Sequence, residues 1–546
     1  MAFDSASDPP KGVADERGAG YVAEPGVPRG RSAWFGGKDV KIGPRIAPIV
    51  APIGSSSAAT STSDLNSADE ILIKQKASEE NCAIQYRTCS WQKVRLKLEY
   101  SDAQTAAKAW HTLISDLQTA ALLFSEYICL AIMSFPWSYS VLGLVPGLIL
   151  TVVQALLVLY TSIILWEFCL RHPEVRDVCD IGQMLFWNKK WAWWFTAVMF
   201  VLNNTFIQGL HVLVGAKYIN TMIGTGDAGV SCQTVSFGII VALIAWICSL
   251  PRTFDMLSKL GTASAFFTFI SVLLATIFAA IQFQPAGYTE ELGSPIVTAI
   301  PLAGTTFVSG LNAFLNISYT FIGQITLPSF IAEMKDPRDF PKALWACTIL
   351  EILVFSIVGA VVYAYVGNQY MTAPAFGSLE TLYKKVSFSF MIPTLIFLGV
   401  LYASVSARFI FFRIFQNSRH KNEHTLIGWA SWSGILLATW ILAFLIANVI
   451  PFFSSLLSLM SSLFDSFFGF IFWGVAYFRM READGSVALV KDRSFRGWFE
   501  GILNVLIILT GLFFLTAGTY ASVEGIILEF EAGTVGSVFQ CASNGI

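Results

Sequence analysis

Residues 312–328 read NAFLNISYTFIGQITLP, an apolar stretch that polar side chains interrupt and a proline ends. Together with the residues before it, this stretch is long enough to cross a bilayer. Gly323 and Pro328 both weaken a helix, because glycine is flexible and proline lacks a backbone N–H. The pattern is typical of a membrane helix that unwinds around a ligand near the bilayer centre.

A second interrupted span lies five spans earlier in the sequence. Residues 125–136 read SEYICLAIMSFP, and Pro136 disrupts the helix in the middle of its apolar run. Interrupted helices at matching positions of two halves indicate a transporter binding site, because the freed N–H and C=O groups face a ligand there. A packing kink without a ligand is the alternative interpretation.

Apolar runs of spanning length repeat along the rest of the chain. We count eleven, at about 119–141, 147–170, 192–214, 234–250, 258–281, 303–328, 343–366, 387–411, 426–449, 452–478 and 498–522. The composition agrees, with 55% hydrophobic and 13% charged residues, against about 25% charged in soluble domains. We therefore expect an all-α polytopic membrane protein with 11 transmembrane helices. This excludes a soluble enzyme, and a net charge of −2 offers nucleic acid no attraction.

The basic residues of the loops indicate the orientation. Seventeen Lys and Arg follow even-numbered spans and three follow odd-numbered ones. Since cytosolic loops carry the excess of positive charge, the N-terminus is predicted to be cytosolic. We expect a largely disordered cytosolic tail over 1–115, a transmembrane transporter domain over 116–525 and a short extracellular tail over 526–546.

Cysteines suggest one covalent link on the outer side. Of the nine cysteines, Cys232 and Cys541 fall outside the membrane on the extracellular side. They are candidates for a disulfide that ties the C-terminal tail to an external loop. Two unpaired thiols are the alternative.

Polar groups inside the apolar runs are the candidate functional residues, because they are costly in a membrane. Glu126 lies ten residues before Pro136, and a carboxylate buried there is a candidate proton carrier. A glutamate held by a neighbouring hydroxyl or amide is the alternative. Asp465, Glu351 and Asn204 are weaker signals, since single polar residues more often bond to a neighbouring helix.

Residues 330–344, FIAEMKDPRDFPKAL, resemble the amino acid/auxin permease family, and most of all its fungal neutral amino acid branch. The motifs LPRT at 250–253 and HPE at 172–174 fit the same family. The resemblance covers about 110–525. It implies a LeuT-like fold in which spans 1–5 and 6–10 are inverted repeats and an eleventh span is added.

The resemblance also implies where an amino acid and its coupling ion bind. The backbone of the substrate is expected at the break of the first span, at Tyr127, Ile128, Cys129, Leu130, Ala131, Ile132 and Met133. Its side chain is expected to face Asn204, Ser318, Tyr319, Phe321 and Gly323. In sodium-coupled relatives, positions that correspond to Ser125 and Ser404 hold the ion.

Two departures from the family bear on the substrate. Cys129 and Ala131 stand where relatives often have glycine, and Asp465 stands where they are usually small and uncharged. Ala131 adds a methyl group beside the expected ligand. Asp465 is either a second titrating group or a residue facing water.

These observations predict a secondary transporter that imports neutral amino acids, aromatic ones among them, by proton symport at the plasma membrane. We expect membrane lipid to surround the protein, and we expect no cofactor apart from the coupling ion. Two alternatives stay open: a nutrient sensor that signals through the N-terminal tail, and a vacuolar amino acid exporter of the same fold. An enzyme is not expected, because no metal or nucleophile constellation occurs.

Overall fold

The structure is a computed structural model in which part of the chain is described. The described residues are 32–37, 40, 42–46, 127, 129–175, 177–223, 233–252, 254–334, 336–416, 418–421, 423, 425–485, 495–533, 538, 539 and 541. Most of the predicted N-terminal tail therefore lies outside them. The predicted site residues Ser125, Glu126, Ile128 and Cys232 also lie outside the described residues.

The described part of the chain is helical and contains no strand, which confirms the all-α prediction. Eight segments are long and apolar enough to cross a membrane. They involve α5 (Leu144–Arg171), α7 (Lys190–Ile223), α9 (Phe254–Ile281) from Ala263 onward, α12 (Phe340–Val366), α14 (Ile392–Ile414), α15 (Leu426–Val449), the run α16 (Phe453–Met460), η6 (Ser461–Ile471) and α17 (Phe472–Ala483), and, from Gly497 onward, the run α18 (Phe495–Phe513), η7 (Phe514–Gly518) and α19 (Thr519–Glu531).

Shorter helices cover the other three expected spans. They are η2 (Leu130–Ser134) with α4 (Phe135–Leu142), α8 (Gln233–Ser249), and α10 (Phe307–Phe321) with α11 (Leu327–Glu333). The total of eleven spans and the inverted repeat stay predictions. Short elements outside the spans are α1 (Ser32–Phe35), α6 (Val178–Leu185), η3 (Pro337–Asp339), η4 (Ala375–Ser378), α13 (Thr381–Ser389) and η5 (Arg419–Lys421).

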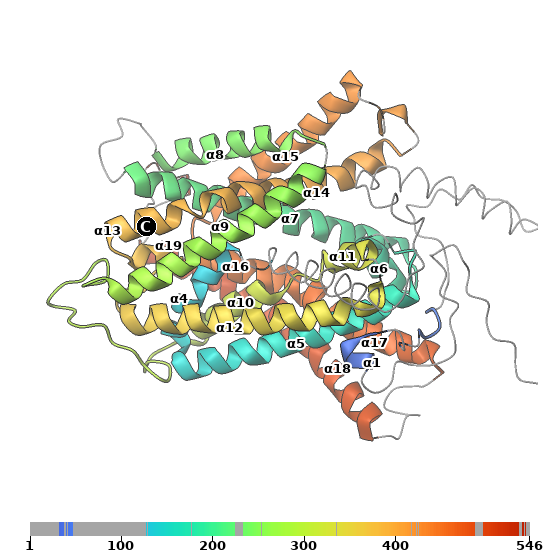
Figure 1. Ribbon diagram of the computed structural model, residues 1–546, viewed down its shortest axis with the longest axis horizontal. Helices are drawn as coiled ribbons and strands as arrows, with labels where there is room; N and C mark the ends of the chain where they lie inside the picture. Colours follow the sequence, from blue (N-terminus) through green and yellow to red (C-terminus); the bar gives the residue numbers. More distant parts are fainter. Residues whose placement is uncertain are drawn as a thin grey trace, which may run out of the picture.

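The helices form two neighbouring groups. Figure 1 shows α5 and α12 side by side along one edge of the molecule and α8 with α15 along the opposite edge, and both pairs are in contact. Between these edges α7 contacts α14 and α15, and α10 contacts α4 and α16. Large apolar side chains such as Ile149, Val153 and Leu353 are exposed on the outer faces, as lipid contact requires.

Both predicted breaks are present, and each has a local cause. α10 ends at Phe321, Ile322 is extended, and α11 begins with Pro328 in its first turn, where the missing N–H of proline costs nothing. In the first span Cys129 is extended and a short 3₁₀ helix precedes α4, which carries Pro136 in its first turn. The two prolines therefore begin helices and do not end them.

The two broken spans contact each other. The ring of Phe135, which begins α4, lies 6.1 Å from that of Phe321 at the end of α10, and both adjoin Phe355 of α12. Edge-to-face and tilted rings of this kind add to the packing energy of the buried area. This aromatic cluster fixes the first, sixth and seventh spans beside one another.

Part of the N-terminal tail is ordered against the body of the protein. The side chains of Val40, Ile42 and Ile46 are buried. The indole N–H of Trp345 on α12 donates to the carbonyl of Trp34 at 3.0 Å, and the amide of Gly37 donates to the carbonyl of Arg338 at 3.0 Å. The predicted tail therefore includes a short segment that packs against the body of the protein.

A charged cluster joins the ends of the second and tenth spans beside that segment. The guanidinium of Arg171 at the end of α5 reaches Asp484 at 2.8 Å and Glu167 at 2.5 Å. Arg481 contacts the same two carboxylates, Glu167 at 3.1 Å and Asp484 at 3.0 Å. Because both arginines and both acids are largely buried, every charge in this cluster has an opposite partner.

Candidate functional site

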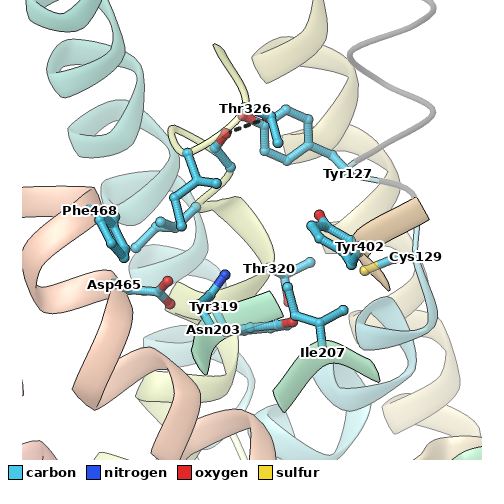
Figure 2. Close-up of a pocket in the computed structure, with 13 residues that line it drawn as sticks. Tyr127, Cys129, Asn203, Ile207, Tyr319, Thr320, Thr326, Tyr402, Asp465 and Phe468 are labelled. Atoms are coloured by element: carbon cyan, nitrogen blue, oxygen red, sulfur yellow. Dashed lines mark hydrogen bonds between the residues drawn. The ribbon is translucent and has the colours of Figure 1, made fainter. Parts of the chain in front are cut away.

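A cavity lies where the two breaks meet. Its volume is about 60 Å³, which is room for roughly four water molecules. It is bounded by the first, third, sixth, eighth and tenth spans, and the residues that line it are Tyr127, Cys129, Asn203, Ile207, Tyr319, Thr320, Ile322, Gly323, Ile325, Thr326, Tyr402, Asp465 and Phe468. Figure 2 shows their side chains around the cavity.

Tyr127 and Gly323 bring the two breaks into contact. A Cβ atom at position 323 would lie 2.7 Å from the Cε1, Cζ and Oη atoms of Tyr127. Glycine is therefore required at this point of the sixth span for the tyrosine ring to occupy its position. The unwound segment after Gly323 is closed by Thr326, whose hydroxyl donates to the carbonyl of Gly323 at 2.9 Å.

The wall from the third span presents an amide to the cavity. Asn203 lines the cavity and donates to the side-chain oxygen of Asn204 at 3.4 Å. Asn204 is fully buried and donates to the hydroxyl of Ser406 on α14 at 3.0 Å. The neighbouring asparagines thus connect the cavity wall to the eighth span, and Asn203 stands where Asn204 was expected.

Asp465 is the acidic residue of the cavity. It is 5% exposed, and its Oδ2 atom accepts no hydrogen bond from the described residues. It lies in η6, a π-helical stretch, and such stretches are frequent at functional sites. Figure 2 shows it beside Asn203 and Tyr319. A carboxylate without a cation in this position is costly as an anion and needs a proton or a positively charged ligand.

The structure divides the predicted substrate residues into two groups. Tyr127, Cys129, Tyr319 and Gly323 line the cavity. The others lie behind its wall: Leu130, Ala131, Ile132 and Met133 are buried in the core, Phe321 belongs to the aromatic cluster, and Ser318 accepts a hydrogen bond from Gln154 at 2.7 Å. The methyl group of Ala131 therefore does not reduce the described cavity.

The ion-coupling residues are also divided. Asp465 lines the cavity, whereas Ser404 is buried outside its lining, and its hydroxyl has no partner among the described residues. No group of three or more metal-ligating side chains occurs in the part of the chain that the structure describes. Cys541 is disulfide-bonded, but Cys232 lies outside the described residues, so their pairing stays a prediction.

Several lining residues escaped the sequence analysis. Ile322, Ile325 and Thr326 belong to the unwound part of the sixth span and Thr320 to the last turn of α10, and continuing the predicted break in both directions would have included them. Tyr402 and Phe468 come from the eighth and tenth spans. Their inward direction depends on how those helices are rotated, which no local sequence pattern reports.

Two broken spans beside a buried cavity in a helical membrane protein are typical of a transporter. The model of the family "Transmembrane amino acid transporter protein" matches residues 113–524. The chain therefore belongs to the transmembrane amino acid transporter family, and it is an integral membrane protein and not an enzyme, as the sequence predicted.

Two similar proteins agree with the assignment to this family. The N amino acid transport system protein of Neurospora crassa is 31% identical over 443 residues, which are 81% of this chain and 91% of that protein. The amino acid transporter AVT1J of Arabidopsis thaliana is 23% identical over 411 residues, 73% of this chain and 88% of that protein. The fungal similarity agrees with the predicted branch.

Among solved structures, the chain is remotely similar to MhsT in complex with L-phenylalanine. The identity is 13% and the TM-score 0.43, and the match covers 76% of this chain and 98% of that one.

Proposed function

We propose that this amino acid transporter is a proton symporter that imports neutral amino acids across the plasma membrane. The observation that carries the proposal is the buried carboxylate of Asp465 in a cavity lined by both broken spans. Its charge has no counter-cation among the described lining residues. Binding a proton together with the substrate removes the cost of that charge, and this links the two ligands.

The remaining lining suits the zwitterionic part of an amino acid. Unwound backbone exposes N–H groups that favour a carboxylate and C=O groups that favour an ammonium. Around these groups the wall carries hydroxyls of Tyr319, Thr320 and Tyr402 and apolar side chains of Ile207 and Phe468. A substrate with an uncharged side chain fits this mixture better than one that needs a second counter-charge.

The size of the cavity bears on aromatic substrates. A cavity of about 60 Å³ holds roughly four waters, so the described conformation suits a small substrate. An aromatic side chain requires an outward movement of Tyr127, Tyr402 or Phe468. Alternating access, in which one group of helices rocks against the other around the breaks, supplies such a movement.

The direct test is uptake of labelled neutral amino acids by proteoliposomes that contain the purified protein. We expect accumulation under an inward proton gradient alone, and no added effect of a sodium gradient. Asp465→Asn, which keeps the shape and removes the titrating group, is expected to abolish proton-driven accumulation. Accumulation that needs sodium and ignores the proton gradient would contradict the proposal.

The sensor is the second candidate, because the N-terminal segment around residues 40–46 is packed against the body of the protein. A sensor would bind an amino acid without accumulating it. Deleting residues 1–100 separates the two candidates, since uptake survives the deletion in a transporter whose tail is regulatory. A fluorescent fusion places the protein in the plasma membrane or, for the exporter alternative, the vacuolar membrane.

A further inference from the structure

A second buried carboxylate lies on the far side of the first-span break. Glu351 is on α12, the seventh span, and is 4% exposed. Its Oε1 atom accepts a hydrogen bond from the thiol of Cys347 at 3.1 Å. A thiol is a weak donor and leaves most of the acceptor capacity of a carboxylate unused.

Glu351 borders a small cavity of its own. The cavity has a volume of about 10 Å³, which is close to the space of one water molecule. Its polar lining comes from Tyr127, Ser162, Thr348 and Glu351. The hydroxyl of Ser162, which is 1% exposed, has no partner among the described residues. One water there would reach several polar groups, which is the number a buried water needs.

Tyr127 separates this cavity from the substrate cavity. It lines both of them, and its ring rests on Gly323 of the sixth span. A shift of Tyr127 away from Gly323 would therefore open one cavity to the other. The side chain that closes the two breaks is also the partition between two buried carboxylates, Asp465 and Glu351.

Among the described residues, no positively charged side chain faces Glu351. Among the described residues, the titratable groups that face it are Tyr127 from the first span and Cys347 from its own helix, and the lining residues from α5 and α10 carry no charge. No lysine, arginine or histidine occurs among the described lining residues. An ionised Glu351 is costly in this closed state, and admitting water past Tyr127 lowers that cost.

We propose that Glu351 is a second proton site of the transport cycle and that Tyr127 controls access to it. The carboxylate holds a proton while Tyr127 is seated on Gly323. When Tyr127 moves, the proton passes through water from the carboxyl oxygen to the open side. This inference rests on the proposed proton symport, and it adds a site outside the substrate cavity.

The test compares accumulation with exchange in proteoliposomes. One coupling proton per cycle, held in turn by Asp465 and Glu351, supports an accumulation of about tenfold in a gradient of one pH unit. We expect Glu351→Gln to lose this accumulation and to equilibrate the substrate, while exchange of internal for external substrate at equal pH stays within about twofold of wild type. The matched control is Glu291→Gln, which changes an exposed glutamate and leaves both rates unchanged.

The outcomes separate the two proposals. Full accumulation by Glu351→Gln with the wild-type pH profile, or loss of exchange in a folded variant, would overturn the role of Glu351. If Glu351→Gln does not fold, Ser162→Ala keeps the carboxylate and removes a neighbouring hydroxyl; an unchanged pH midpoint of uptake would then overturn it. Failure of proton-driven uptake in wild type would instead refute the proton symport itself.

Discussion

A Cβ atom on Gly323 would lie 2.7 Å from the ring of Tyr127, so the breaks of the first and sixth spans meet without room for any side chain between them. Real Cβ atoms essentially never lie closer than 3.0 Å to a non-bonded heavy atom of another residue. The contact places the tyrosine hydroxyl and the unwound backbone of the sixth span at one cavity. We therefore expect a displacement of one break to move the other.

Replacing Gly323 with alanine tests this contact. We expect Gly323→Ala to displace Tyr127 and lower the rate of uptake by about tenfold or more, because overpacking of a well-packed site costs about 1–3 kcal/mol. The measurement is initial uptake by proteoliposomes containing equal amounts of protein. Gly310→Ala is the control, since nothing lies within 4 Å of a Cβ at Gly310 of the same span. Equal rates for both variants would contradict the role of the contact.

The hydrogen bond between Asn204 and Ser406 holds the third span against the eighth. We expect Ser406→Ala to lower the free energy of unfolding by about 1–3 kcal/mol, because it leaves a buried amide donor unsatisfied. Thermal melting in detergent measures the change. Ser294→Ala, at an exposed position, is the control and is expected to melt at the wild-type temperature. A Ser406→Ala protein that melts at the wild-type temperature would show that the bond contributes nothing.

The charged cluster at the ends of the second and tenth spans is expected to be sensitive to the loss of one partner. Asp484→Asn leaves Arg171, whose side chain is fully buried, with Glu167 as its one remaining carboxylate among the described residues, and breaking a buried pair costs about 3–5 kcal/mol. The more exposed pair of Arg45 and Glu174, whose side chains are 46% and 28% exposed, is the control, because Arg45→Ala should cost about 0–1 kcal/mol. Thermal melting measures the loss of stability in both variants. Equal losses would contradict the expected greater sensitivity of the buried cluster.

The position of the break in the sixth span follows from its sequence, because glycine and proline act locally on the backbone. Gly323 lies in the unwound segment, and Pro328 stands in the first turn of the next helix. Asp465 could also be identified as a candidate from the sequence, because a carboxylate inside a membrane span is energetically costly and therefore indicates a functional site.

The lining of the cavity is less predictable, because it depends on helix rotation. The side chains of Leu130–Met133, in the 3₁₀ turn at the predicted substrate site, are buried in the core and do not line the cavity. Asn203 replaces Asn204 at the cavity, since neighbours on a helix point about 100° apart. No local sequence pattern marks Tyr402, which lines the cavity because of how α14 packs against its neighbours, α7 among them.

The docked N-terminal segment depends on the protonation of one histidine. The amide of Ile46 donates to Nε2 of His172 at 3.2 Å, while Nδ1 of the same ring lies 3.1 Å from Glu174. In this arrangement Nε2 is an acceptor, so the ring is neutral. Burial lowers the pKa of His172 below its ordinary value of 6.5, although the bond with Glu174 opposes this shift.

Acidification is therefore expected to release the segment. A histidine with a lowered pKa stabilises the docked state fully above pH 6.5, and this contribution is lost as pH falls below that value, because the undocked state then binds more protons. Hydrogen exchange of the Ile46 amide, followed at pH 7.5 and 5.5 with correction for intrinsic rates, measures the release. His172→Gln offers an uncharged acceptor. In this variant the protection of the Ile46 amide should therefore be the same at both pH values. Equal protection of wild type at both would show that the segment is held without His172, by contacts such as that of Arg171 with the carbonyl of Pro44 at 3.2 Å.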